Sequence, residues 1–388
     1  MAAWRAGSIA LAAFLTWRII AVNALLVDEN GRSKLPAVTH AASEGTDRQA
    51  LVQILRDDPG EVAALLVLAQ DLERTGEAAR AARTYESALA VAPMDRDTLR
   101  AAAAFALRQG RMKEALERLD MLATYFGDHD TVFPVLAQLL EAGDPNWTAI
   151  AARGPSWLGA FITSSCRQGV NPALLVPLLQ KRVAARRAEP AEVECVTEKL
   201  RAVGRWDAAY QVWLNTLPRE RLADVGFVFN GGFEFTSSGV GFDWRTAPGT
   251  ERETGHSVEF ALSRGGVGKR ALRVTYNGKR QVAAAVAQYL ALVPGSYELH
   301  GLARIDSLNS VRGLQWVLRC AAQERAPLLA SSERFLGSSE WRPFSFEVAI
   351  PANCTGQTLQ LEPAGMADGT TYLAGTAWFD ELRLRRLH

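Results

Sequence analysis

The hydrophobic period of the chain changes near Asp224, and this change separates two kinds of fold. Before it, residues 51–122 are rich in alanine and leucine and repeat their apolar positions with a helical period. After it, seven or eight short alternating segments are separated by clusters of glycine, proline, asparagine and serine, a pattern typical of a β-sandwich or jelly roll. The 388 residues suffice for two or three domains. We therefore expect a multidomain α and β protein, with a helical repeat domain over residues 47–220 and a jelly roll over residues 221–388.

The N-terminal segment over residues 6–27 is apolar and has about the 20 residues that a membrane-spanning helix needs. Arg18 interrupts it, and a charge inside a bilayer costs a few kcal/mol. Three interpretations stay open: an uncleaved anchor, a signal peptide cleaved near Ala24, or a buried helix of a soluble domain. Arg5 precedes the segment and Asp28 and Glu29 follow it, and this distribution of charge favours an orientation with the N-terminus inside. We expect a bacterial inner-membrane anchor or signal segment in residues 1–27, a linker in residues 28–46, and a body in the periplasm.

A spacing of 34 residues recurs within the helical region, where it separates Gly76 from Gly110. The tetratricopeptide repeat has this period, and Tyr85 stands where that motif has an aromatic residue. The region therefore resembles a tetratricopeptide array, whose concave face binds segments of partner proteins. An ordinary helical bundle is the alternative, because alanine-rich helices can mimic the motif. We expect Tyr85 and Trp213 to be buried between helices.

Landmarks in a fixed order run through the predicted β domain. They are Asn230-Gly231-Gly232-Phe233-Glu234, Gly241-Phe242-Asp243-Trp244, Gly268 with Ala271-Leu272-Arg273-Val274, Val293-Pro294-Gly295-Ser296-Tyr297, Trp341, and Ala377-Trp378-Phe379-Asp380-Glu381-Leu382. In their order and spacing, the domain resembles the carbohydrate-binding modules of bacterial polysaccharide-active enzymes, a branch of the galactose-binding-like jelly rolls. The resemblance implies that Phe233 and Phe379 lie on adjacent terminal strands. We expect Trp244 and Trp341 to pack at the edge of the sandwich; the alternative is that they hold sugar.

The resemblance also implies a structural calcium ion near the paired ends of the first and last strands. Glu234 and Asp380 occupy these places in the sequence, and carboxylate oxygens are the ligands that calcium requires. The alternative is that both side chains accept backbone hydrogen bonds and hold no metal.

Strand alternation indicates which side chains of the β domain face solvent. Leu314, Trp316, Leu318 and Cys320 share one face of a predicted strand, which we interpret as core. Sugar recognition needs an aromatic platform and planar polar groups. The candidates on the outer faces are Tyr289, Glu298, Arg304, Gln315 and Arg319. An ordinary solvated sheet shows the same polar pattern and is the alternative.

The four cysteines show no metal-binding spacing. Cys320 ends a predicted strand and Cys354 lies on the turn into another strand of the same sandwich, so we expect a disulfide between them in an oxidising compartment. If the chain stays in the cytoplasm, both are free buried thiols. Cys166 and Cys195 lie on separate predicted helices, and their spacing gives no reason for them to meet.

The charge balance of 43 basic against 42 acidic residues gives no electrostatic footprint for nucleic acid. The chain has no nucleophile elbow, zinc-protease helix, P-loop or dinucleotide-binding glycine motif. We therefore expect a non-enzymatic, membrane-tethered scaffold without a cofactor other than calcium. Its helical repeats dock an envelope protein partner, and its jelly roll binds a polysaccharide or packs on other subunits, as in accessory proteins of exopolysaccharide assembly and export. The alternatives are a purely structural assembly subunit that binds no sugar, and an unrecognised polysaccharide hydrolase or lyase.

Overall fold

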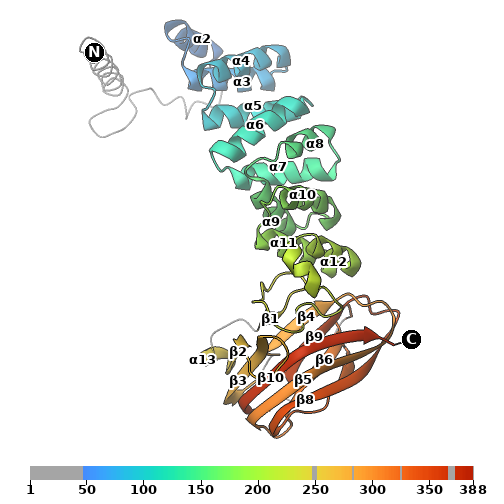
Figure 1. Cartoon of the computed structure of the whole chain (residues 1–388). Helices are drawn as coiled ribbons and strands as arrows, with labels where there is room; N and C mark the ends of the chain where they lie inside the picture. The colour runs from blue at the N-terminus through green and yellow to red at the C-terminus, as the bar shows by residue number, and fades with distance from the viewer. Residues whose placement is uncertain (1–46, 247–250, 282–283, 324–325, 366–371, 388) are drawn as a thin grey trace, which may run out of the picture. The chain divides into compact units, whose positions relative to one another are not determined.

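The computed structural model describes residues 47–387 except 247–250, 282–283, 324–325 and 366–371. The chain divides into two compact units, and the division falls between Asp128 and His129. In its described part the first unit is helical, whereas the second contains helices and a β-sandwich (Figure 1). A domain boundary near residue 220 stays a prediction.

The described helices of the first unit are α2 (Arg48–Asp57), α3 (Val62–Arg74), α4 (Ala78–Val91), α5 (Arg96–Arg108) and α6 (Met112–Tyr125). Gly76 follows α3 and Gly110 follows α5, each with a positive φ (81° and 69°) that favours glycine after a helix. Tyr85 on α4 is 1% exposed, and its ring lies 4.9 Å from that of Phe105 on α5. The expected helical region and the burial of Tyr85 between helices are therefore confirmed, while the tetratricopeptide register stays a prediction.

The helices of the second unit are α7 (His129–Glu141), α8 (Pro145–Ala152), α9 (Leu158–Gln168), α10 (Pro172–Ala184), α11 (Pro190–Ala202) and α12 (Trp206–Leu214), followed by the short 3-10 helix η2 (Arg219–Asp224). A disulfide joins Cys166 on α9 to Cys195 on α11, with a Cα–Cα distance of 6.1 Å. Our expectation that these cysteines do not meet was wrong. Helices α9 and α11 pack against each other, and a contact between helices that are not neighbours in the sequence leaves no sign in cysteine spacing.

The described strands of the sandwich are β1 (Arg245–Thr246), β2 (His256–Leu262), β3 (Arg270–Arg280), β4 (Val286–Leu290), β5 (Gly295–Asn309), β6 (Leu314–Cys320), β7 (Leu328–Ser331), β8 (Gly337–Ile350), β9 (Gln357–Pro363) and β10 (Tyr372–Arg386), with the short helix α13 (Glu251–Thr254) before β2. They form a first sheet with the order β1-β4-β9-β6-β7 and a second sheet with the order β2-β3-β10-β5-β8 (Figure 1). All strand pairs are antiparallel. The expected β-sandwich is confirmed.

The core lies between the two sheets and follows the predicted alternation. Leu314, Trp316, Leu318 and Cys320 of β6 are fully buried in one cluster with Tyr297 of β5. Burying apolar side chains contributes about 25 cal/mol per Å² of surface removed from water, so this cluster stabilises the sandwich.

The landmark aromatic residues take places that differ in part from the expected ones. Trp244 lies within the core instead of at its edge, with its ring 5.8 Å from that of Trp316. Phe233 lies in no strand and has a φ of 54°, so its expected place on a terminal strand was wrong. Its segment nevertheless runs beside β10, because the Leu382 N–H donates to the Gly231 carbonyl at 2.9 Å. This hydrogen bond places the segment before β1 against β10, the last strand.

Helices α11 and α12 pack directly against the sandwich within the second unit. The indole ring of Trp206 occupies the space that a side chain at Gly356 would take. Trp213 is buried, with its ring 5.0 Å from Phe229 and 5.7 Å from Phe242. The expected burial of Trp213 is confirmed, but its aromatic neighbours include residues of the segment that enters the sandwich.

The expected disulfide between Cys320 and Cys354 is confirmed, with a Cα–Cα distance of 5.7 Å. It joins the end of β6 to the turn before β9 inside the core. Disulfides persist in oxidising compartments, so the two bridges indicate an extracellular or periplasmic protein.

The placement in the inner membrane by a single N-terminal helix needs correction. The segment over residues 6–27 lies outside the described residues. Within the part of the chain that the structure describes, no helix combines the length and the apolar character that crossing a bilayer requires.

Candidate functional site

Strands β4, β9 and β6 are adjacent in the first sheet (Figure 1). Polar side chains lie on the outer face of these strands, where apolar Ala287 and Val317 flank Gln360. Pairing places Tyr289 beside Thr358 and Thr358 beside Arg319, while Glu362 lies beside Gln315. The alternate residues of β9 and β6 belong to the core, so these side chains point away from it. We call this surface the β9 face.

A hydrogen-bonded network fixes the middle of the β9 face. The Glu362 carboxylate is 2% exposed and accepts from Arg319 Nη2 at 2.7 Å and from Gln360 Nε2 at 2.5 Å. Because these bonds hold a guanidinium and an amide in fixed planes, the remaining N–H groups of both side chains are oriented for a ligand. Arg319 keeps 27% of its side chain exposed.

Tyr289 lies at the margin of the β9 face, where α11 and α12 cover its ring. The Arg201 guanidinium carbon lies 4.4 Å from the ring centroid, and that of Arg245 lies 5.0 Å away. The Trp206 ring meets it edge-on at 5.7 Å. The ring of Tyr289 is therefore engaged within the protein instead of forming an open platform for a sugar.

Two of the five candidate residues lie on the other sheet. Glu298 and Arg304 are on β5 in the second sheet, whereas Gln315 and Arg319 are on β6 and Tyr289 is on β4 in the first. The structure thus brings three candidates onto one face and separates them from the other two. Alternation reveals whether a side chain points inward or outward, but it carries no information on which sheet a strand joins.

The outer face of the second sheet holds its own cluster around Trp378. Pairing sets Trp378 beside Arg273 and Arg304, and its indole N–H donates to Asp306 at 3.2 Å. The Arg273 guanidinium carbon lies 5.3 Å from the indole ring, and Arg304 also donates to Asp306. These bonds engage the Trp378 indole and the Asp306 carboxylate, whereas the buried Arg304 Nε has no hydrogen-bond partner among the described residues. The sequence marked Trp378 only as a landmark, without a role.

We did not identify from the sequence the β9 residues of the β9 face. Thr358, Gln360 and Glu362 alternate with the core residues Leu359 and Leu361. That alternation was visible in the sequence and was the signal for an outward polar row. What the sequence lacks is the pairing that sets β9 between β4 and β6.

The proposed calcium ligands lie close to one loop but are engaged by its backbone. Glu234 Oε1 accepts from the Lys269 N–H at 2.6 Å, and Asp380 Oδ2 accepts from the Val267 N–H at 2.8 Å. Burial raises the pKa of Asp380 to about 6, although its backbone hydrogen bonds lower the pKa. Repulsion from nearby Glu381 and Glu234 raises the pKa further. A cation would relieve that repulsion. However, the described residues contain no group of three or more His, Cys, Asp or Glu side chains placed to share a metal, so the fit is only partial.

Comparisons with solved structures find carbohydrate-binding modules. A CBM4 module matches 41% of this chain and 99% of its own length at 14% identity and a TM-score of 0.31. The CBM22-1 xylan-binding domain from Paenibacillus barcinonensis Xyn10C matches 40% of this chain and 91% of its own length at 14% identity and a TM-score of 0.28. The module TmCBM61, in complex with β-1,4-galactotriose, matches 42% of this chain and 99% of its own length at 16% identity and a TM-score of 0.27.

No protein-family model matches the chain, and no curated protein matches its sequence. The C-terminal β-sandwich resembles carbohydrate-binding modules at low identity.

Proposed function

We propose that the sandwich binds a polysaccharide through the β9 face. The observation that carries the proposal is the network in which Glu362 fixes Arg319 and Gln360 on an outward sheet surface. Planar groups with fixed orientation suit the closely spaced hydroxyls of a sugar, because each offers hydrogen bonds in a defined plane. A pre-organised polar surface also loses little side-chain entropy on binding.

The helical region is proposed to bind a protein partner. Support comes from the 34-residue spacing of Gly76 and Gly110 and from the helix pairs whose turns these glycines form. Tetratricopeptide-like arrays provide surfaces for protein segments and have no inherent chemistry. We therefore propose a non-enzymatic scaffold that holds a polysaccharide near a protein partner during exopolysaccharide assembly or export.

A glycan microarray probed with the full chain tests the polysaccharide proposal. The proposal predicts binding to at least one polysaccharide class, loss of that signal in Gln360→Ala, and no release of reducing ends from the bound glycan. Release of reducing ends would instead identify a hydrolase or lyase. No binding to any glycan would contradict the proposal.

A second candidate function is a structural assembly subunit that binds no sugar. The covered ring of Tyr289 favours it, because the aromatic residue best placed beside the β9 face packs on Arg201 and Trp206. This function predicts a silent microarray together with a partner protein that co-purifies with the chain from its native source.

A structural calcium ion at Glu234 and Asp380 is a further part of the proposal. Calcium binding to the folded state alone would stabilise the sandwich by mass action. Thermal unfolding in excess Ca²⁺ should then give a higher Tm than in chelator, with Mg²⁺ as the control and Asp380→Asn abolishing the difference. Equal Tm values in Ca²⁺ and chelator would contradict the ion.

A further inference from the structure

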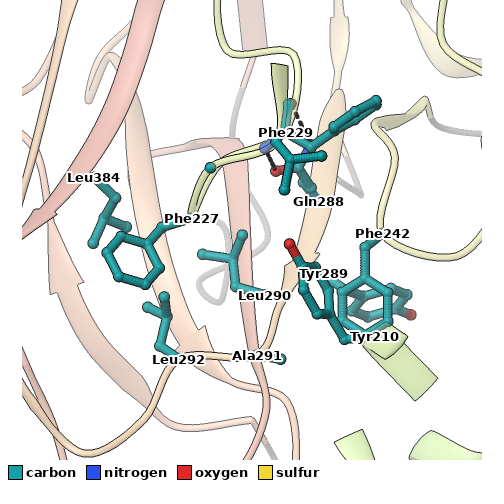
Figure 2. Close-up of a pocket in the computed structure, with 12 residues that line it drawn as sticks. Tyr210, Phe227, Phe229, Phe242, Gln288, Tyr289, Leu290, Ala291, Leu292 and Leu384 are labelled. Carbon is teal, nitrogen blue, oxygen red and sulfur yellow. Dashed lines mark hydrogen bonds between the residues drawn. The ribbon is translucent and has the colours of Figure 1, made fainter. Parts of the chain in front are cut away.

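A pocket of about 390 Å³ lies beside the end of β4, between the segment over residues 225–229 and helix α12 (Figure 2). The rings of Tyr210, Phe227, Phe229, Phe242 and Tyr289 form much of its lining. Pockets of this size and apolar character are typical of small-molecule sites. The pocket is separate from the network of the β9 face, because neither Arg319, Gln360 nor Glu362 lines it.

Buried glutamine amides hold two sides of the pocket in place. Gln288 is fully buried and makes two hydrogen bonds to the backbone of Phe229, accepting at 3.1 Å and donating at 2.9 Å (Figure 2). Gln357 is also fully buried and accepts from the Leu292 N–H at 2.8 Å. Since these walls are fixed, the pocket does not have to form when a ligand binds.

One aromatic residue of the lining is open to solvent. Phe227 is 45% exposed, and its ring lies 5.4 Å from that of Tyr297. Leu290 and Leu292, by contrast, are 2% and 3% exposed. An exposed ring beside buried apolar side chains offers a ligand both an entrance and an apolar surface to cover.

The lining residues of the pocket carry no charged side chain. Burial raises the pKa of Tyr210, so this phenol is neutral as well. An ionised ligand would lose its hydration here without gaining a charged partner among the lining residues. The pocket therefore selects an uncharged molecule.

The hydroxyl of Tyr289 supplies one polar group to the pocket. This hydroxyl makes no hydrogen bond to any described residue and is turned toward Gln288, whose amide is already used by Phe229 (Figure 2). The Tyr289 ring is held by Arg201 at 4.4 Å and Trp206 at 5.7 Å. A fixed hydroxyl in an apolar pocket favours a ligand that brings one matching polar atom.

We propose that this pocket binds an uncharged small molecule with a flat apolar ring system and one hydroxyl or carbonyl group, which hydrogen-bonds to Tyr289. The flat rings pack against the aromatic lining in offset or edge-on contacts. This site goes beyond the glycan proposal and does not depend on it.

Titration of the full chain with three related probes tests the proposal. The probes are 2-naphthol, naphthalene, and naphthalene-2-sulfonate. We expect 2-naphthol to bind at one site per chain and the sulfonate to bind at least about tenfold more weakly. Tyr289→Phe should lower the affinity for 2-naphthol about fivefold, because one neutral hydrogen bond is lost, and should leave the affinity for naphthalene unchanged.

A pair of matched variants localises the site. Ala291 lines the pocket and Ala322 is exposed on a turn outside it, so Ala291→Trp should abolish probe binding and Ala322→Trp should preserve it. Matching far-UV and thermal unfolding profiles establish that both variants fold; if Ala291→Trp does not, the Tyr289→Phe comparison decides alone. Saturable probe binding by a folded Ala291→Trp variant would overturn the proposal. So would an affinity for naphthalene-2-sulfonate equal to that for 2-naphthol. An equal loss of affinity for 2-naphthol and naphthalene in Tyr289→Phe would overturn it as well.

Discussion

Glu194 on α11 connects three groups from two distant parts of the chain. It accepts from Arg245 Nη2 at 2.6 Å, from Arg201 Nη2 at 3.2 Å and from the Gly241 N–H at 2.7 Å. Burial opposes ionisation, but the hydrogen bonds from Arg245 and Gly241 outweigh it and hold the pKa of this carboxyl below its usual range. The carboxylate thereby ties the helices of the second unit to the start of β1.

Replacing Glu194 with Gln should lower the free energy of unfolding by about 1.5–3 kcal/mol at pH 7, because charged hydrogen bonds are lost. Since the folded pKa lies below the unfolded one, this stabilisation is complete above about pH 4.3 and is lost as pH falls through the folded pKa. Chemical denaturation at pH 7 and pH 3 measures both effects. Glu198→Gln, exposed on the same helix, is the control. An equal loss for the two variants, or a difference unaffected by pH, would contradict this role.

From the sequence we predicted correctly which side chains of the sandwich point away from the core, but not which residues they contact. Gln315, Arg319 and Tyr289 do point away from the core, as alternation indicates. Alternation did not reveal that Arg201 packs on Tyr289, because a cation–π contact between a helix and a strand distant in the sequence has no local signature. Glu362 was missed for the same reason, since its partner Arg319 is on another strand.

At the scale of elements, aromatic side chains fill the gaps between packed helices. Tyr85 of α4 lies against Phe105 of α5, and its hydroxyl reaches Glu73 at 3.4 Å. Burial raises the pKa of Tyr85 to about 12, so the hydroxyl stays neutral. The helical period and the glycines after α3 and α5 were sufficient to predict this packing.

Tyr85→Ala should destabilise the first unit by about 3–5 kcal/mol, because it leaves a cavity between α4 and α5. Thermal unfolding followed by far-UV circular dichroism measures the effect. The matched control is Tyr125→Ala on α6, whose side chain is 67% exposed and should change stability by less than about 0.5 kcal/mol. An unchanged Tm for Tyr85→Ala would show that the proposed helix packing is wrong.

The two disulfides fix pairs of elements that are not neighbours in the sequence. Removing the Cys320–Cys354 bridge by a double Cys→Ser substitution should cost about 2–5 kcal/mol of unfolding free energy. Non-reducing peptide mapping of protein from its native source should recover Cys320 linked to Cys354, and Cys166 linked to Cys195. Recovery of all four peptides singly, alkylated without reductant, would count against both bridges and against an oxidising compartment.

In the whole molecule, the order of a helical part followed by a sandwich could be predicted from the sequence. The position at which the chain divides into compact units could not. The change of period near Asp224 marks a change of secondary structure, whereas the compact units divide between Asp128 and His129. The difference arises because Trp206 and Trp213 of α12 pack on Gly356 and Phe229. Such tertiary contacts do not alter the hydrophobic period of either part.

Limited proteolysis should cut within η2, whose residues are not buried, and give a helical and a β-rich fragment. Because α11 and α12 pack on the sandwich, the two fragments should co-elute in native gel filtration and separate only in denaturant. Trp206→Ala should weaken this association. Fragments that separate without denaturant would show that the helices and the sandwich are independent domains.

Isothermal titration with the glycan that binds best on the microarray measures whether the β9 face recognises a polysaccharide. Arg319→Met and Arg304→Met remove the same guanidinium from opposite sheets and keep the aliphatic stem. We predict that Arg319→Met lowers the affinity about tenfold or more, because charged hydrogen bonds to the sugar are lost, and that Arg304→Met changes it little. Unchanged affinity in Arg319→Met, or a larger loss in Arg304→Met, would contradict this prediction.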